Sequence, residues 1–364
     1  MVSGGYLMLL PEVFKAYQSL QDKRDAYIAT LMQGCKTDEE VFTTKRLYGL
    51  GGSDMAKVMG ESKWGSAYEI WQVKTFKQTK NIKNDIPLEV GHELEEMIAR
   101  RYEKQTGFTV CEANSVAMVG MPFLVGNFDR VVFDKALEEG GKIIGGLECK
   151  TTGINNSVVV NGVMRSKWGK ANIYDGTTLV QESDLIDPEY IAQVQFYMLV
   201  SGLKWWDVGV LISNTEIRFY RVHFDKDYCN RMYEVACNFW INNVLEDKAP
   251  AITFSDAQNM QPEKDVEMQA NADLIARVQK IKEYDIEIKA LEEKQALLKN
   301  ALATEIVDVT KVKYTDAQGK SKTLLTFKGS TRTSFDSKAF QVKHPDLYQE
   351  FMKTTQTART LRIY

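Results

Sequence analysis

Glu148 and Lys150 stand two positions apart in the segment 145–150. In a β-strand, side chains two positions apart point to one face, so a strand here would place a carboxylate beside an ammonium. Carboxylate oxygens suit Mg²⁺, and the ammonium could take part in proton transfer or stabilise charge beside an attacking water. Taken alone, the pair is common in proteins, and its first explanation is an exposed ion pair worth about 0–1 kcal/mol.

Asp129 lies nineteen residues before Glu148, at the start of a predicted strand over 129–134. The turn-rich residues 138–141 join this segment to a second predicted strand over 143–150. If the two strands are antiparallel neighbours, Asp129 lies close to Glu148. Phosphodiester hydrolysis needs an activated water and screening of charge on the phosphorane and the leaving oxygen. One or two Mg²⁺ ions held by carboxylates supply both.

Glu95 lies in a predicted helix before these strands, and Gln193 lies in a predicted helix after them. The order helix Glu, Asp, Glu-x-Lys, helix Gln resembles the PD-(D/E)xK nuclease superfamily. It is more closely similar to the YqaJ and lambda exonuclease branch of phage recombination exonucleases. Residues 46–54 resemble the N-terminal motif of that branch, and Tyr68–Trp71 also match it. The resemblance spans residues 46–222.

The resemblance implies an α/β, restriction-endonuclease-like core, in which a central mixed sheet is flanked by helices. It implies a Mg²⁺-dependent deoxyribonuclease that degrades linear duplex DNA from a 5′ end. Asp129, Glu148 and the main-chain carbonyl of Cys149 would bind metal. Lys150 would orient or deprotonate the water, or offset developing charge. Gln193 would fix the geometry of Lys150 and the water.

Glu95 would hold a second metal or its waters in such an enzyme. Glu93 and Glu96 lie close to it in the sequence, so a small error in aligning this chain with the family motif would assign the metal ligand to one of them instead. Arg46 and Ser53 fall where the family binds the 5′-terminal phosphate. That use suits a guanidinium fork and a glycine-rich turn at a helix N-terminus.

Four other side chains leave alternatives open or exclude a cofactor. Trp64, near the phosphate motif, could act as a wedge at a DNA end or pack in the protein. Tyr190 could contact DNA or the active-site helix. Cys229 and Cys237 do not reproduce the cysteine cluster of the iron–sulfur nucleases that share this superfamily core, so we expect no iron–sulfur cluster. Mg²⁺ is the expected cofactor, and Mn²⁺ is expected to substitute for it.

Together these residues predict a 5′→3′ exonuclease of a phage or prophage recombination system. It would act on double-stranded DNA ends and leave a 3′ single strand for a single-strand annealing protein. The lambda-like branch implies a trimeric, ring-shaped homo-oligomer. Two alternatives stay open at this point: an endonuclease on the same core, and a DNA-end-binding scaffold with weak or no catalysis.

The composition of the 364-residue chain excludes several other classes of protein. With 44% hydrophobic and 26% charged residues, it is neither collagen-like nor disordered. Three histidines and five scattered cysteines leave little material for Ser–His–Asp catalysis, a zinc site or a disulfide framework. No apolar run approaches the roughly 18–20 residues that span a bilayer. We therefore expect a soluble, cytoplasmic protein that works through carboxylates and lysine.

The net charge of −3 does not indicate whether the chain binds nucleic acid, but the distribution of basic residues along the sequence is informative. Residues 45–83 hold eight basic and three acidic side chains, and residues 311–364 hold eleven and four. Such local positive fields suit a polyanionic ligand. A solvated lysine face explains each of them about as well.

Hydrophobic periodicity and breaker residues predict an α/β core with additions at both ends. The expected parts are a helical extension over 1–40, a nuclease domain over 41–250, a linker over 251–262, a coiled-coil-like helix over 263–305, and a basic tail over 306–364. The expected helices cover 11–33, 54–59 with Ser53-Asp54 as N-cap, a short one from 66, 88–104, 190–201 and 228–245. The remaining expected strands lie within 108–125 and form a hairpin, 206–213 and 217–223, around Asn214.

The segment from Leu274 to Leu302 has apolar residues at the first and fourth positions of a seven-residue repeat. This is the pattern of a coiled coil, with Gln295 as one polar exception, or of a helix that packs on its own domain. A β-hairpin with its turn at 317–319 is expected next, and then a basic, aromatic segment over 334–348. Residues 334–363 resemble the C-terminal segment of some longer family members.

Overall fold

The computed structural model describes residues 10–78, 86–153, 157–160, 163–166, 168–183, 186–213, 215–260, 267–315, 319–329, 331, 333–354 and 357–363. The chain divides into two compact units, Met1–Ala257 and Gln258–Tyr364. In the part of the chain that is described, no helix is both long and apolar enough to cross a membrane.

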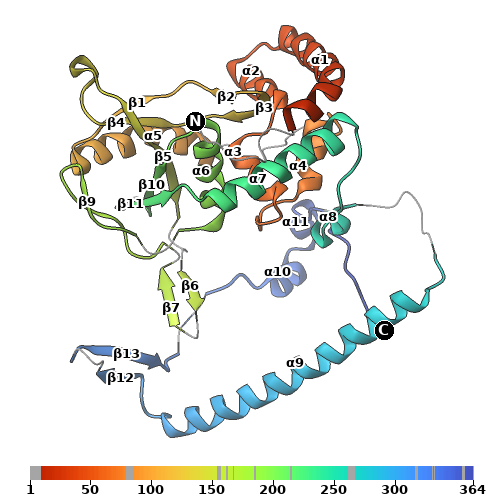
Figure 1. Cartoon of the computed structure of the whole chain (residues 1–364). Helices are drawn as coiled ribbons and strands as arrows, with labels where there is room; N and C mark the ends of the chain where they lie inside the picture. Colours follow the sequence, from red (N-terminus) through yellow and green to blue (C-terminus); the bar gives the residue numbers. More distant parts are fainter. Residues whose placement is uncertain are drawn as a thin grey trace. The chain divides into compact units, whose positions relative to one another are not determined.

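A five-stranded sheet forms the centre of the first unit (Figure 1). Its strands, in spatial order, are β1 (Thr109–Glu112), β4 (Arg130–Phe133), β5 (Ile143–Thr152), β10 (Trp205–Ile212) and β11 (Glu216–His223). The pair β5 and β10 is parallel, and every other pair in the sheet is antiparallel. A parallel pair needs a long crossover, and helix α6 (Pro188–Ser201) lies in the segment that connects these two strands.

Helices cover both faces of this sheet, because alternate residues of its strands enter two different cores. Trp206 and Val208 of β10 belong to a core that also contains Val194 of α6. Leu211 of β10 belongs to a second core with Ile98 of α5 (Ile86–Thr106). Residues an odd number of positions apart on a strand face opposite sides, so α5 and α6 lie on opposite faces. This confirms the central mixed sheet flanked by helices expected from the sequence.

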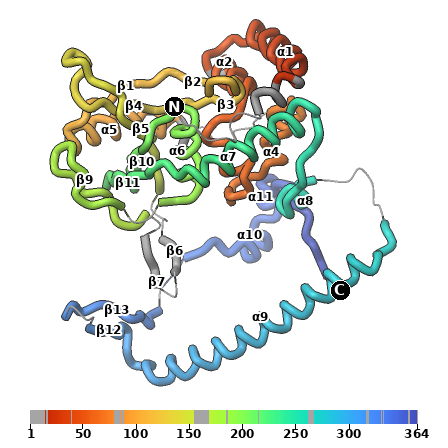
Figure 2. The backbone as a smooth tube through the Cα atoms, in the orientation of Figure 1, coloured from red at the N-terminus to blue at the C-terminus, as the bar shows by residue number. Residues whose placement is uncertain are grey.

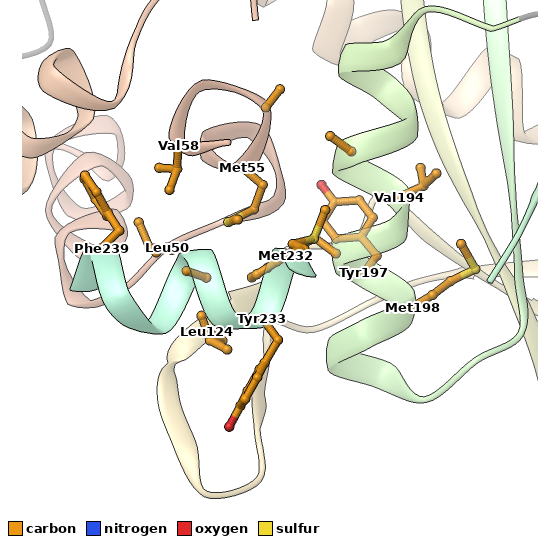
Figure 3. Packing of buried hydrophobic residues seen from close by; sticks show 14 of the residues in the cluster. Leu50, Met55, Val58, Leu124, Val194, Tyr197, Met198, Met232, Tyr233 and Phe239 are labelled. Atoms are coloured by element: carbon orange, nitrogen blue, oxygen red, sulfur yellow. The ribbon is translucent and has the colours of Figure 1, made fainter. Parts of the chain in front are cut away.

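Several helices gather at one side of the sheet and pack on α6 or on one another (Figure 2). They are α1 (Leu10–Gly34), α2 (Asp38–Lys45), the 3₁₀ turn η1 (Arg46–Tyr48), α3 (Gly52–Val58), α4 (Ala67–Lys74), α7 (Lys226–Asn238) and the π-helical η3 (Phe239–Leu245). Figure 3 shows the apolar core where α3, α6 and α7 meet, to which Met55, Tyr197 and Met232 all belong.

The segment expected to be one helix over 228–245 is an α-helix up to Asn238 and has π geometry over Phe239–Leu245.

Short hairpins and a 3₁₀ turn complete the first unit. They are β2 (Val116–Met118) with β3 (Met121–Gly126), η2 (Leu137–Glu139), β6 (Ser157–Val160) with β7 (Val163–Ser166), and β8 (Ile173–Asp175) with β9 (Thr178–Gln181). The strands expected within 108–125 are β1, β2 and β3. The hairpin turn expected at Asn214 lies outside the described residues.

A short helix, α8 (Phe254–Asn259), occupies part of the segment expected to be a linker. Asp256 Oδ2 accepts the Thr253 N–H at 2.7 Å and so caps this turn, which is why a polar, breaker-rich sequence still forms a helix here. The second unit consists of α9 (Ala272–Glu305), β12 (Lys311–Thr315) paired with β13 (Ser321–Thr326), α10 (Ser337–Lys343) and α11 (Pro345–Glu350). Of the turn expected at 317–319, only Gly319 is described.

Helix α9 has no buried residue along its 34 positions. The apolar seam expected from the heptads is exposed, with Ile288 and Leu298 among its members. Both alternatives, a coiled coil and a helix packed on its own domain, stay predictions for this segment. The helix itself is present as expected.

Candidate active site

Strand β5 presents Glu148 and Lys150 on the face covered by α6. Both residues pair in register with β10 residues that enter the α6 core: Glu148 with Val208, and Lys150 with Val210. Lys150 Nζ forms an ion pair with Glu148 Oε1. The strand geometry expected for the Glu-x-Lys pair is therefore confirmed. Glu148 is almost fully buried, so this pair is not the exposed ion pair of the simpler explanation.

Asp129 lies beside this pair because β4 and β5 are antiparallel neighbours. Arg130 pairs with Leu147, so the next pair in the same register is Asp129 with Glu148. Asp129 Oδ2 accepts the main-chain N–H of Cys149 at 2.7 Å. Burial, and then the nearby charge of Asp129, raise the pKa of Glu148 to about 8. Burial alone would lower the pKa of Lys150, but the carboxylates of Glu148 and Asp129 hold it above its ordinary value.

Helix α6 supplies Gln193, whose side chain links Glu148 of β5 to Tyr197 of α6 by hydrogen bonds. Its Nε2 donates to Glu148 Oε1 at 2.6 Å and to the hydroxyl of Tyr197 at 2.7 Å. Burial, followed by the charges of Glu148 and Asp129, raises the pKa of Tyr197 well above its usual range. The sequence analysis did not select Tyr197. Its position one helical turn after Gln193 was the only signal available.

Glu95 approaches the same carboxylates from α5. Burial and the charge of Asp129 raise the pKa of Glu95, and its Oε1 lies 3.0 Å from Nδ1 of His92. Glu96 instead contacts Arg130 Nη2 at 3.1 Å, and Glu93 is exposed. Of the three candidate glutamates, Glu95 is the one that faces Asp129.

The donor set suits a divalent cation of the Mg²⁺ type. Glu148 Oε2 is buried and has no hydrogen-bond partner among the described residues. That oxygen and the adjacent Asp129 carboxylate are the hard ligands that Mg²⁺ prefers. In the described part of the chain, no three His, Cys, Asp or Glu side chains converge closely enough to enclose a metal. Two carboxylates supplemented by water are consistent with Mg²⁺, which usually keeps several waters.

Arg46 and Ser53, expected at a phosphate site, lie in contact. Arg46 Nη2 donates to Ser53 Oγ at 2.6 Å, and Ser53 is exposed. The N-cap expected at Ser53-Asp54 is wrong, because the cap of α3 is Gly51, two residues before Ser53. Asp54 is the third residue of the helix, and its carboxylate accepts the Gly51 N–H at 3.0 Å.

The residues between Arg46 and Ser53 are fixed to β3 and to α6. Leu50 forms main-chain hydrogen bonds with Phe123 O and Val125 N at 2.7 and 2.9 Å. A Cβ atom on Gly52 would lie 2.6 Å from Cε1 of Tyr197. The segment therefore packs directly on the helix that holds Glu148, and only glycine fits at position 52.

Trp64 and Tyr190 have different surroundings. Trp64 is 71% exposed, with the ammonium of Lys63 5.4 Å from its ring centroid, so packing does not explain it. Tyr190 stacks on Trp168 with 5.4 Å between ring centroids, and Lys150 Nζ lies 5.4 Å from the Tyr190 centroid. Tyr190 thus lies beside Lys150 of the candidate site, and its contact with DNA stays a prediction.

Comparison with known proteins agrees with the resemblance noted from the sequence. Residues 42–204 match the model of the YqaJ-like viral recombinase domain. The uncharacterized protein YqaJ of Bacillus subtilis (strain 168) is 25% identical over 341 residues, which cover 90% of this chain and 95% of that protein. All the site residues described above lie within residues 42–204, and the similarity to YqaJ extends well beyond them.

Two solved structures are similar to this chain at lower sequence identity than YqaJ. An alkaline exonuclease from Laribacter hongkongensis shares 20% identity with a TM-score of 0.41, covering 58% of this chain and 94% of that one. A phage related exonuclease from Haemophilus somnus 129PT shares 12% identity with a TM-score of 0.35, covering 55% of this chain and 96% of that one.

Proposed function

We propose that this chain is a Mg²⁺-dependent 5′→3′ exonuclease acting on linear double-stranded DNA, a proposal supported by the match of residues 42–204 to the model of the YqaJ-like viral recombinase domain. The observation that carries the proposal is the group Asp129, Glu148, Lys150 and Gln193, joined by hydrogen bonds and an ion pair at one end of β5. Such a group suits phosphodiester hydrolysis and needs neither histidine nor cysteine side chains.

Asp129, Glu148 and the carbonyl of Cys149 would hold Mg²⁺, with Glu95 holding a second ion or its waters. When bound, the metal supplies an activated water and neutralises charge on the phosphorane. Lys150 donates hydrogen bonds to the attacking water or to a phosphate oxygen. Gln193 holds the Glu148 carboxylate by its hydrogen bond and so fixes the geometry of the whole group.

Arg46 and Ser53 would bind the 5′-terminal phosphate. A guanidinium and a hydroxyl in contact offer several N–H and O–H donors to one phosphate group. A terminal phosphate is present only at an end, so this pair favours an exonuclease over an endonuclease on the same core. Gly52, next to Ser53, packs on the ring of Tyr197, and Gln193 donates to both the Tyr197 hydroxyl and Glu148, so the proposed phosphate segment lies against the helix that holds Glu148.

The products and partners follow from this polarity. Removal of nucleotides from 5′ ends leaves a 3′ single strand, which is the substrate of a single-strand annealing protein. We propose that the exposed seam of α9 and the basic tail serve assembly: a homo-oligomer, trimeric by resemblance, or docking of that annealing partner. Trp64, exposed beside Lys63, is proposed to contact the DNA.

The test uses 5′-phosphorylated linear duplex labelled at either end, with Mg²⁺, and compares the wild-type protein with Glu148→Ala. Release of nucleotides from the 5′ end that requires Mg²⁺ and is lost in the variant supports the proposal. Closed-circular duplex is the parallel substrate, and its cleavage would favour the endonuclease instead. DNA binding without cleavage under Mg²⁺ or Mn²⁺ would favour the end-binding scaffold.

A further inference from the structure

Lys74 is a buried lysine at the last position of α4, and it contacts the segment between Arg46 and Asp54. Only 3% of the residue is exposed. Its Nζ donates to the carbonyl oxygens of Arg46 and Gly49, both at 2.7 Å, and lies 3.0 Å from Asp54 Oδ2. An ammonium has three N–H donors, and each has a partner here.

A second cation, the half-buried Arg24 of α1, holds the same segment. Its Nη2 donates to the carbonyl oxygen of Leu47 at 2.7 Å. The guanidinium carbon lies 4.9 Å from the ring centroid of Phe76 and 5.1 Å from that of Trp240. Phe76 has a φ of 61°, which is unusual for a non-glycine residue and is sustained only by firm surroundings. Two cations thus hold three of the four carbonyl oxygens of residues 46–49.

Charges of both signs surround Lys74. Arg46 and Arg24 repel Lys74, and Asp54 attracts it. Asp25 is the carboxylate beside Arg24, and Asp22 is near Asp25. Lys74 is therefore held in place by its two carbonyl contacts and its ion pair with Asp54.

We infer that Lys74, together with Arg24, is a positioning residue for recognition of a DNA 5′-phosphate. The two cations fix the main chain from which the Arg46 side chain extends to Ser53. This inference rests on the proposed function of Arg46 and Ser53. Neither cation touches the DNA; each acts through the geometry of the Arg46 segment.

The experiment compares kcat/KM on duplexes with a 5′-phosphate and with a 5′-hydroxyl. A preference for phosphate of about ten- to a hundredfold is expected for the wild-type protein, because charge-assisted hydrogen bonds are lost with the phosphate. Lys74→Met should bring this ratio towards one, mainly by raising KM on the phosphate duplex. Arg24→Met should act in the same direction.

Two further variants separate positioning from folding. Lys74→Met leaves the buried Asp54 without its nearer cation, so Lys74→Met/Asp54→Asn, which removes both charges and keeps an acceptor for the Gly51 N–H, is measured beside it. Lys74→Met/Arg46→Ala should lose no more preference than Arg46→Ala alone, because both changes act on one contact. Lys57→Met is the control, since Lys57 pairs with Glu69 on the neighbouring helix surface and should keep the wild-type ratio.

The possible results separate the positioning role of Lys74 and Arg24 from the proposed phosphate site of Arg46 and Ser53. A wild-type protein that prefers the phosphate, and variants of Lys74 and Arg24 that keep that preference when folded, would overturn the positioning role alone. A wild-type protein that degrades both duplexes equally would overturn the phosphate site and this inference with it. Absence of any degradation would overturn the proposed function itself.

Discussion

Gly52 lies against the ring of Tyr197, so close that a Cβ atom at position 52 would meet Cε1 at 2.6 Å. The same Tyr197 hydroxyl receives the hydrogen bond of Gln193, which also holds Glu148. The segment that carries Arg46 is therefore in direct van der Waals contact with the helix that orients the catalytic carboxylate. The residues proposed for end recognition and those proposed for catalysis therefore share one packed layer of side chains.

Gly52→Ala should impair both functions at once. The added methyl group must displace either Tyr197 or the main chain of α3, at a cost of about 1–3 kcal/mol of stability. We expect a lower melting temperature together with a fall in kcat and in the preference for 5′-phosphate. Gly34→Ala is the matched control, because a Cβ atom there meets no atom within 4 Å. Wild-type kinetics in Gly52→Ala would show that the contact is not tight in solution.

Gln193→Ala should lower kcat by about 10- to 100-fold, the range typical of residues that orient a metal ligand. Its Nε2 holds Glu148 Oε1 at 2.6 Å, and no other donor of α6 is recorded on that oxygen. Gln193→Glu should be worse, since it sets a second carboxylate against Glu148. Single-turnover rates at saturating Mg²⁺ would check this order. Equal rates for the two variants would indicate that Gln193 acts only by filling space.

Glu95→Ala should raise the Mg²⁺ concentration needed for half-maximal activity, because Glu95 is the helix glutamate whose pKa responds to Asp129. Glu93→Ala removes an exposed carboxylate from the same turn of α5 and should leave that concentration unchanged. Titrating Mg²⁺ against the initial rate of nucleotide release compares the two variants. An effect in Glu93→Ala alone would mean that the helix presents the other glutamate to the metal.

Asp54 should make stability depend on pH in the acid range. Burial alone would raise the pKa of Asp54, but Lys74, Arg46 and the Gly51 N–H hold it below its ordinary value. A carboxyl with a lowered pKa in the folded state stabilises the fold fully above its unfolded pKa of about 3.9, and this stability is lost as the pH falls through the folded value.

The free energy of unfolding, measured between about pH 3 and pH 7, should therefore fall more steeply in acid for the wild-type protein than for Lys74→Met/Asp54→Asn. Identical slopes would show that Asp54 is protonated alike in both states.

The catalytic pair could be predicted from the sequence because it depends on local geometry. Glu148 and Lys150 share a face through the two-residue period of a strand, and Asp129 follows from antiparallel pairing across a short connection. The contacts of Lys74 with Arg46 and Gly49 could not be predicted, since they join segments that no local pattern relates. The seven-residue repeat predicted the helix α9 correctly, yet a repeat is silent on what covers its seam.

The hydrogen bonds around the buried Asp207 are a second set of contacts that the sequence could not predict. Arg221 contacts both of its oxygens at 2.7 and 2.8 Å, and Tyr102, 105 positions earlier in the chain, donates to one of them at 2.7 Å. Each of these side chains looks like an ordinary surface residue in the sequence. Only the packing of α5 on β10 and β11 reveals that they satisfy one another.

Because Arg24 lies in α1, upstream of the matched domain, the position of the junction matters when this domain is joined to another protein. A chimaera joined at residue 42 would keep all of the residues proposed for catalysis, since they lie within residues 42–204. It would nevertheless place an unrelated helix beside Leu47 and Phe76, where Arg24 now lies. Such a chimaera should still hydrolyse DNA but should discriminate poorly between kinds of end. The smallest module that can be transplanted with its selectivity intact therefore begins upstream of Arg24.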